Sequence, residues 1–228
     1  MWLWCHLLTP EPHKGAQPLR WLEKRLRSGL TRLTLVTDQP AAHMHVPYFV
    51  VKQKLTMMVN RYEISEADQS FNPVRLLALA EQKRMAFKEQ VTFYSDAGKS
   101  RPVFGFKARK KLDLGSGYDI TDEGGQQIGF FKKDFGASLL RSTFHIEGAG
   151  FAGTGQERNQ LVALLRRFTE IPMLPIHFDF VDAQGQKLLS VERRMSIGDR
   201  YNVTVADTRV DFRVAAAVAV GLDALMAR

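Results

Sequence analysis

The sequence predicts a mainly β protein with a central α-helix: a closed antiparallel barrel of about twelve strands around a hydrophobic C-terminal helix. Three observations predict this fold. A hairpin pattern recurs along the chain, turns that contain Asp and Gly separate its strands, and the last segment is apolar around nearly its whole circumference. At 228 residues the chain is long enough for one sizeable barrel domain.

Each copy of the hairpin pattern is an aliphatic or aromatic strand ending in Lys or Arg, a short link, and an aromatic-x-aliphatic strand ending in Asp. The five copies are VVKQKLTMMVNRYEISEAD, LLALAEQKRMAFKEQVTFYSDAG, VFGFKARKKLDLGSGYDITDEGG, IGFFKKDFGASLLRSTFHIE and LLSVERRMSIGDRYNVTVAD. Strand cores such as Tyr118-Asp119-Ile120 alternate with period two, as half-buried strands do. In the turns at 96–98, 122–125 and 182–185, we expect Gly to supply a positive φ.

Residues 210–227 (VDFRVAAAVAVGLDALMA) are predicted to form the central helix. A helix that is apolar on all sides must be buried in a core or in a membrane. The uninterrupted apolar run, Val214 to Leu222, is about nine residues, whereas a bilayer needs about twenty. Asp211, Arg213 and Asp223 are also costly in hydrocarbon. About twelve strands are too many for a flat sheet and enclose a lumen that such a helix fills.

Residues 148–175 interrupt the hairpins and are predicted to be a helical insertion. Thr154 to Glu157 fits a capping box, and Leu161, Leu165 and Phe168 share one apolar face. The helix either covers an open end of the barrel or lies on a lipid surface. The G-x-G-x-x-G at 148–153 is interpreted as a flexible loop, because no parallel βαβ pattern surrounds it.

Residues 1–43 are predicted to be a loosely structured N-terminal extension, and residues 44–228 the barrel domain. The first segment lacks strand alternation and contains Pro10, Pro12, Pro18 and Pro40, so Met44 is a candidate for the biological start. The whole chain carries a net charge of +8. The first 43 residues hold six Lys/Arg and three Asp/Glu, which leaves +5 for the domain. The one cysteine, Cys5, excludes an internal disulfide and fits a reducing cytoplasm.

Residues 107–146 (KARKKLDLGSGYDITDEGGQQIGFFKKDFGASLLRSTFHI) resemble the central signature of LURP-one-related proteins, of the tubby C-terminal-like and phospholipid scramblase-like superfamily. The opening YFVVKQKLTMMVNRYEI and the closing ERRMSIGDRYNVTV with its apolar helix are similar as well, so the resemblance covers about residues 46–227. It implies a twelve-stranded barrel around a C-terminal helix. Tubby domains bind phosphoinositide headgroups through basic residues on the barrel wall, and scramblases are associated with calcium-dependent lipid movement. The absence of a cysteine-rich palmitoylation segment and of a calcium loop puts scramblase activity in doubt.

The densest basic run supplies the candidate anion-binding residues. On an alternating strand Lys107, Arg109 and Lys111 share one face, and such a face could contact anionic headgroups or be an ordinary solvated exterior. The candidate lipid-binding set is Lys107, Arg109, Lys110, Lys111, Lys132, Lys133 and Arg141. No G-x-S-x-G, H-E-x-x-H or C-x-x-C motif occurs, so we expect no enzyme activity, cofactor or metal site.

The sequence therefore predicts a non-enzymatic binding module that engages anionic phospholipid or phosphoinositide-like headgroups at a membrane surface. Its expected location is the cytoplasm, peripheral to the inner face of the plasma membrane. The alternatives are a scramblase-like membrane protein and a protein-interaction scaffold without lipid binding. Nucleic acid is not an expected partner, because the aromatic residues have the spacing of core positions and no binding module is recognised.

Overall fold

The computed structural model describes residues 42–228 except 56–58, 84–89, 111–112, 135–141, 159–175, 195–199 and 227–228. By compactness the chain divides into Met1–Gln39 and Pro40–Arg228. Of the predicted N-terminal extension only Ala42 and His43 are among the described residues, and the start at Met44 stays a prediction. All of the structure below belongs to the second unit.

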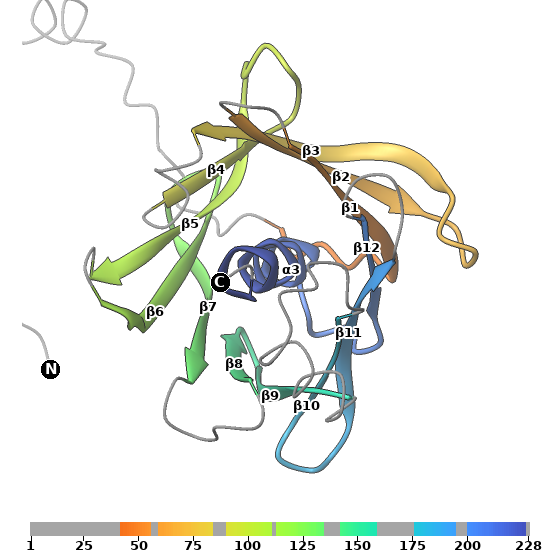
Figure 1. Cartoon of the computed structure of the whole chain (residues 1–228), viewed down its shortest axis with the longest axis vertical. Coiled ribbons are helices and arrows are strands. Elements are labelled where there is room, and N and C mark those ends of the chain that lie inside the picture. Colours follow the sequence, from red (N-terminus) through yellow and green to blue (C-terminus); the bar gives the residue numbers. More distant parts are fainter. Residues whose placement is uncertain are drawn as a thin grey trace, which may run out of the picture. The chain divides into compact units, whose positions relative to one another are not determined.

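The described residues contain twelve strands, which form a closed antiparallel barrel (Figure 1). Each strand pairs with the next one along the chain, and β1 pairs with β12 to close the ring. The predicted fold class is therefore confirmed. The strands are β1 Tyr48–Leu55, β2 Val59–Ala67, β3 Pro73–Lys83, β4 Gln90–Tyr94, β5 Pro102–Lys110, β6 Asp113–Asp122, β7 Gln127–Asp134, β8 Thr143–Gly148, β9 Phe151–Glu157, β10 His177–Val181, β11 Lys187–Arg194 and β12 Arg200–Val205.

The helix α3, Phe212–Met226, runs through the lumen, as the apolar segment predicted (Figure 1). Every residue from Phe212 to Asp223 is buried. Small residues let the helix and the wall approach each other. A Cβ atom on Gly221 of the helix would lie 2.4 Å from the Phe131 ring, and one on Gly129 of β7 would lie 2.8 Å from Val214. The helix thus supplies the filling that side chains of the wall alone cannot provide.

Alternation of side chains across the wall builds the core. On β5, Phe104, Phe106 and Ala108 are buried, whereas Lys107 and Arg109 are exposed. The inward rings pack against one another, for example Phe93 stacked on Phe104 at 4.4 Å between ring centroids. Such aromatic pairs stabilise the core beyond their buried area.

Four turns share one geometry, in which an Asp side chain organises the backbone. Asp122 Oδ1 accepts hydrogen bonds from the Gly124 and Gln126 amides, both at 2.9 Å, and Gly125 has a φ of +84°. Asp182 repeats this arrangement with a positive φ at Gly185. The side-chain bonds replace backbone pairing that the turn interrupts. The turns that begin at Asp68 and Asp96 follow the same pattern.

Three local predictions were wrong. In the turn that begins at Asp96 the positive φ, 57°, belongs to Lys99 and not to Gly98. The predicted helical insertion does not begin at Thr154, because Phe151–Glu157 form strand β9, paired with β8 and β10. The turn that precedes β9 is tight, with Gly150 at a φ of +77°, and is not a flexible loop. The rest of the predicted insertion, 159–175, lies outside the described residues.

Candidate functional site

The outer surface of β5, β6 and β7 carries the described part of the predicted basic face. We call Lys107, Arg109 and Lys132 the outer basic face. Arg109 forms an ion pair with Asp119 of β6 at 2.8 Å, and its guanidinium lies 3.9 Å from the centroid of the Phe130 ring. Arg109 therefore packs on the wall, and a cation held over an aromatic ring loses part of its freedom to bind another anion.

Lys107 and Lys132 have no acidic partner among the described residues. Lys132 is next to Gly117 of β6, where an added Cβ atom would lie 2.4 Å from the Phe130 ring and 2.9 Å from the Lys132 Cβ atom. Gly117 therefore leaves room on the outer surface for these side chains. Beside these three cations lie the carboxylates of Asp119 and of Asp134, which is on the same side of β7 as Lys132, so this part of the wall keeps a small excess of positive charge.

The structure places Lys133, another residue of the predicted set, away from the outer basic face. On β7 the alternation puts Gly129, Phe131 and Lys133 on the inner side, and Lys133 Nζ donates a 2.9 Å hydrogen bond to the carbonyl oxygen of Leu225. A cation at the C-terminal end of a helix satisfies a carbonyl group and complements the helix dipole. Lys133 therefore holds α3 in the barrel.

Of the other predicted basic residues, the structure describes only Lys110. Lys110 is exposed near the end of β5, opposite Asp113 in the register with β6. Lys111 and Arg141 lie outside the described residues. The role of the whole predicted set in binding stays a prediction.

A second site lies at the mouth of the barrel, where α3 begins. Asp211 accepts a hydrogen bond from the Arg213 amide at 2.9 Å, which caps the helix. Its two oxygens also accept bonds from Arg213 Nε at 2.9 Å and Nη2 at 2.7 Å. Both side chains are buried, with relative exposures of 6% for Asp211 and 4% for Arg213.

The chain segment before β1 forms hydrogen bonds at this ion pair. Met44 donates its backbone amide to Asp211 Oδ2 at 3.0 Å, and its carbonyl oxygen accepts from the Phe212 amide at 2.8 Å. His43 Nε2 donates to the carbonyl oxygen of Thr208 at 2.8 Å. Burial by itself raises the pKa of the Asp211 carboxyl, but the hydrogen bonds from Arg213 and Met44 outweigh burial, so the pKa is lowered. The hydrogen bond to Asp211 raises the pKa of Arg213, which stays a cation.

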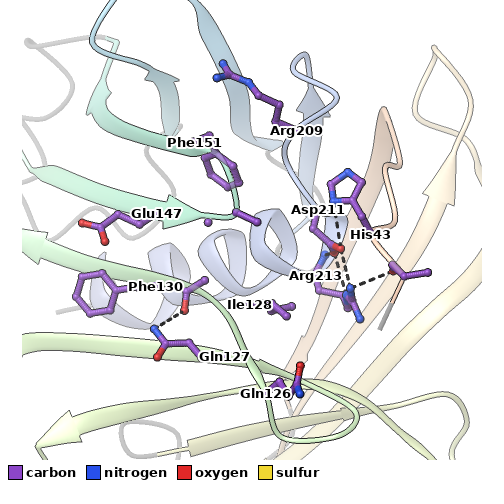
Figure 2. Close-up of a pocket in the computed structure, with 14 residues that line it drawn as sticks. His43, Gln126, Gln127, Ile128, Phe130, Glu147, Phe151, Arg209, Asp211 and Arg213 are labelled. Carbon is purple, nitrogen blue, oxygen red and sulfur yellow. Dashed lines mark hydrogen bonds and ion pairs between the residues drawn. The ribbon is translucent and has the colours of Figure 1, made fainter. Parts of the chain in front are cut away.

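Beside this ion pair is a pocket of about 630 Å³, which we call the mouth pocket (Figure 2). Its apolar wall contains Ile128 and Phe151, and its charged groups are Arg209, Arg213, Asp211 and Glu147. Phe130 also borders the pocket, although its ring lies on the outer surface beneath Arg109. Figure 2 shows Asp211, His43 and Arg213 together at one side and Glu147 at the other. The remaining residues that line it are Ala42, His43, Gln126, Gln127, Gly129, Gly148 and Ala149.

At the opposite end of α3, Asp223 is held by hydroxyl groups of the wall. Tyr62 donates to Asp223 Oδ2 at 3.0 Å, and Tyr201 donates to Oδ1. Gln53 Nε2 in turn donates to the Tyr62 hydroxyl at 2.8 Å. The three charged residues of the helix region that are costly in hydrocarbon therefore all have partners inside the barrel.

The mouth pocket was not predicted from the sequence, because it gathers short segments from four distant parts of the chain. The only signal was the set of charges at 211 and 213 before an apolar helix. Among the described residues there is no group of three or more His, Cys, Asp and Glu side chains that could hold a metal ion. No helix of the described residues is long and apolar enough to cross a bilayer.

Comparison with known proteins adds one finding. No curated protein and no solved structure matches the chain. The model of the family described as LURP-one-related matches residues 78–223, from β3 to near the end of α3. That match spans well over half of the chain and includes the nine barrel strands from β4 to β12. The chain therefore belongs to the LURP-one-related family.

Proposed function

We propose that this domain is a non-enzymatic binding module that engages anionic phospholipid headgroups at the cytoplasmic face of a membrane. The observation that carries the proposal is the outer basic face, where Lys107 and Lys132 lie on neighbouring parts of the wall with no acidic partner among the described residues. Each basic residue near an anionic membrane surface contributes about 1 kcal/mol. Arg109 supports this face through its ion pair with Asp119 and contributes less to binding.

Vesicle pelleting tests the proposal. The full chain is mixed with vesicles of phosphatidylcholine alone, with added phosphatidylserine, or with added phosphoinositide. We expect binding to the anionic vesicles and its loss at high salt, because exposed charges are screened. The double variant Lys107→Glu/Lys132→Glu should bind at least about tenfold more weakly, from the energy per residue given above.

The matched control is Lys52→Glu. Lys52 is also an exposed lysine without an acidic partner among the described residues, but it is on β1, on another side of the ring. If Lys52→Glu weakens binding as much as Lys107→Glu alone or Lys132→Glu alone, then the net charge of the protein and not this face is responsible for binding. Unchanged binding of the double variant would also overturn the proposal.

A protein-interaction scaffold is a second candidate, favoured by β3. Val74 and Leu76 of this strand are 70% and 45% exposed, and the register pairs β3 with β4 at Leu79. Val74 and Leu76 precede this pair, and an exposed apolar strand end of this kind is a place where another chain can add a strand. If the domain ignores every vesicle, and a captured partner is lost in Leu76→Lys but not in Lys52→Glu, the scaffold function replaces the lipid function.

The scramblase-like alternative requires α3 to leave the barrel. It stays a prediction that a fluorescent-lipid flip assay in reconstituted vesicles tests. Flip no faster than in protein-free vesicles would eliminate it.

A further inference from the structure

We propose that the mouth pocket binds an uncharged amphiphile, a ligand with an apolar body and one neutral carbonyl acceptor such as a medium-chain acyl amide or ester. This pocket includes none of the cations of the outer basic face, although Phe130 borders both, and the inference does not depend on the proposed function. Its volume, about 630 Å³, is within the range of small-molecule sites.

The carbonyl acceptor is inferred from Arg213. Its side chain is buried, and its Nε and Nη2 atoms bind Asp211 and the Ala42 carbonyl oxygen, the latter at 3.3 Å. No described residue accepts a hydrogen bond from the third nitrogen, Nη1, although Arg213 lines the pocket. A donor left open in a largely buried guanidinium, beside a cavity, is suited to a ligand oxygen.

The neutral charge of the ligand is inferred from the carboxylates around the pocket. Asp211 already neutralises Arg213. The other cation of the pocket, Arg209, binds Asp207 at 2.6 Å and Asp182 at 3.4 Å. Glu147 adds a further carboxylate with no described partner. Because the carboxylates outnumber the cations, a carboxylate or phosphate ligand is repelled, and an ammonium group cannot accept from Arg213.

The apolar body of the ligand is inferred from the part of the pocket wall that lies between the Asp211–Arg213 pair and Glu147. Ile128 and Phe151 line the pocket, and the Phe151 ring packs against Gly148, where a Cβ atom would lie 2.4 Å from the ring. A short alkyl chain on this wall would gain about 0.8 kcal/mol for each buried methylene group.

Binding of octanamide to the full chain, followed by nuclear magnetic resonance, tests the inference. We expect saturable shifts of the Ile128 methyl groups and of the Arg213 Nε–H signal. Octylamine should bind about tenfold more weakly, the loss expected for one hydrogen bond to a charged group. Octanoate should also bind more weakly than octanamide, because the carboxylates around the pocket repel it. Tighter binding of octanoate, or no saturable shift with octanamide, would overturn the proposal.

Two matched variants locate the binding. Ala149→Trp adds an indole at an exposed turn residue that lines the pocket, and Ala152→Trp adds one at an exposed β9 residue outside the lining. Both should fold, as judged by unchanged thermal unfolding. Ala149→Trp should abolish the octanamide shifts and Ala152→Trp should leave them. Equal effects of the two variants would show that the probe binds elsewhere and would sink the inference.

Discussion

The two ends of α3 solve the same problem, a charged side chain inside a barrel, with different chemistry. At the N-terminal end Asp211 is paired with a full cation, Arg213, and the pair borders an open pocket. At the C-terminal end Asp223 accepts hydrogen bonds from the hydroxyls of Tyr62 and Tyr201, deep in the wall. The difference teaches that a helix can be central to a closed barrel without being wholly apolar, provided that each charge meets a partner from the wall or the helix itself.

The N-terminal end should be the more sensitive to loss of its carboxylate. Asp211→Ala removes the helix cap and leaves Arg213 buried without its counter-charge, so we expect a loss of about 3–5 kcal/mol in the free energy of unfolding, measured by urea denaturation. The control is Asp207→Ala, which breaks the partly exposed pair with Arg209 and one turn hydrogen bond, and should cost about 1–2 kcal/mol. Similar losses in the two variants would mean that burial of the Asp211–Arg213 pair does not matter.

The C-terminal end should respond less strongly, because its partners are uncharged. Asp223→Ala leaves two buried hydroxyls without an acceptor and opens space beside the helix, for an expected loss of about 2–4 kcal/mol. The variant Asp223→Leu/Tyr62→Phe/Tyr201→Phe removes the donors together with the acceptor. It should unfold at a higher urea concentration than Asp223→Ala. A less stable triple variant would show that packing, and not unmet hydrogen bonds, sets the cost.

Acid pH should lower the free energy of unfolding through Asp211, at the N-terminal end of α3, by less than the substitutions above do. The folded protein lowers the pKa of Asp211 below its ordinary value of 3.8, so the stabilisation that this carboxylate gives is fully present above that value. It is lost as the pH falls below 3.8 and through the lowered pKa of the folded state. The difference in unfolding free energy between the wild type and Asp211→Asn should therefore shrink on acidification from neutral pH. A constant difference down to about pH 2 would contradict this assignment.

A second carboxylate tests whether the loss of stability at acid pH comes from Asp211 at the mouth of the barrel. Burial raises the pKa of Asp179 on β10, but hydrogen bonds from Ser190, Arg158 and Lys187 outweigh it and lower the pKa to about 2. Its stabilisation is also lost at acid pH, with an expected size of about 1 kcal/mol after solvent screening. Asp179→Asn therefore provides the background against which the Asp211 effect is measured.

Much of the fold could be predicted because its signals are local. Alternation in strands such as Phe104 to Ala108 and the Asp-Gly turn at 122–125 depend on neighbours within a few residues. Alternation was less informative on β7, where Phe130 and Phe131 are both aromatic. Phe130 lies outside beneath Arg109 and Phe131 lies inside, and this order puts Lys133 on the inner side of the strand. Similarly, Thr154 to Glu157 has the residue types of a helix cap, but pairing with β8 and β10 makes it a strand.

The amino-acid sequence by itself determined that an apolar helix had to be buried, and that strands from the repeated hairpins had to surround it. These are consequences of composition and period, which the chain carries in every conformation. The tertiary structure alone decided which charges meet: Asp211 with Arg213 and Met44, Asp223 with two tyrosines, and Lys133 with the end of α3. Most of these contacts join residues far apart in the chain, and their geometry exists only once the ring has closed around the helix.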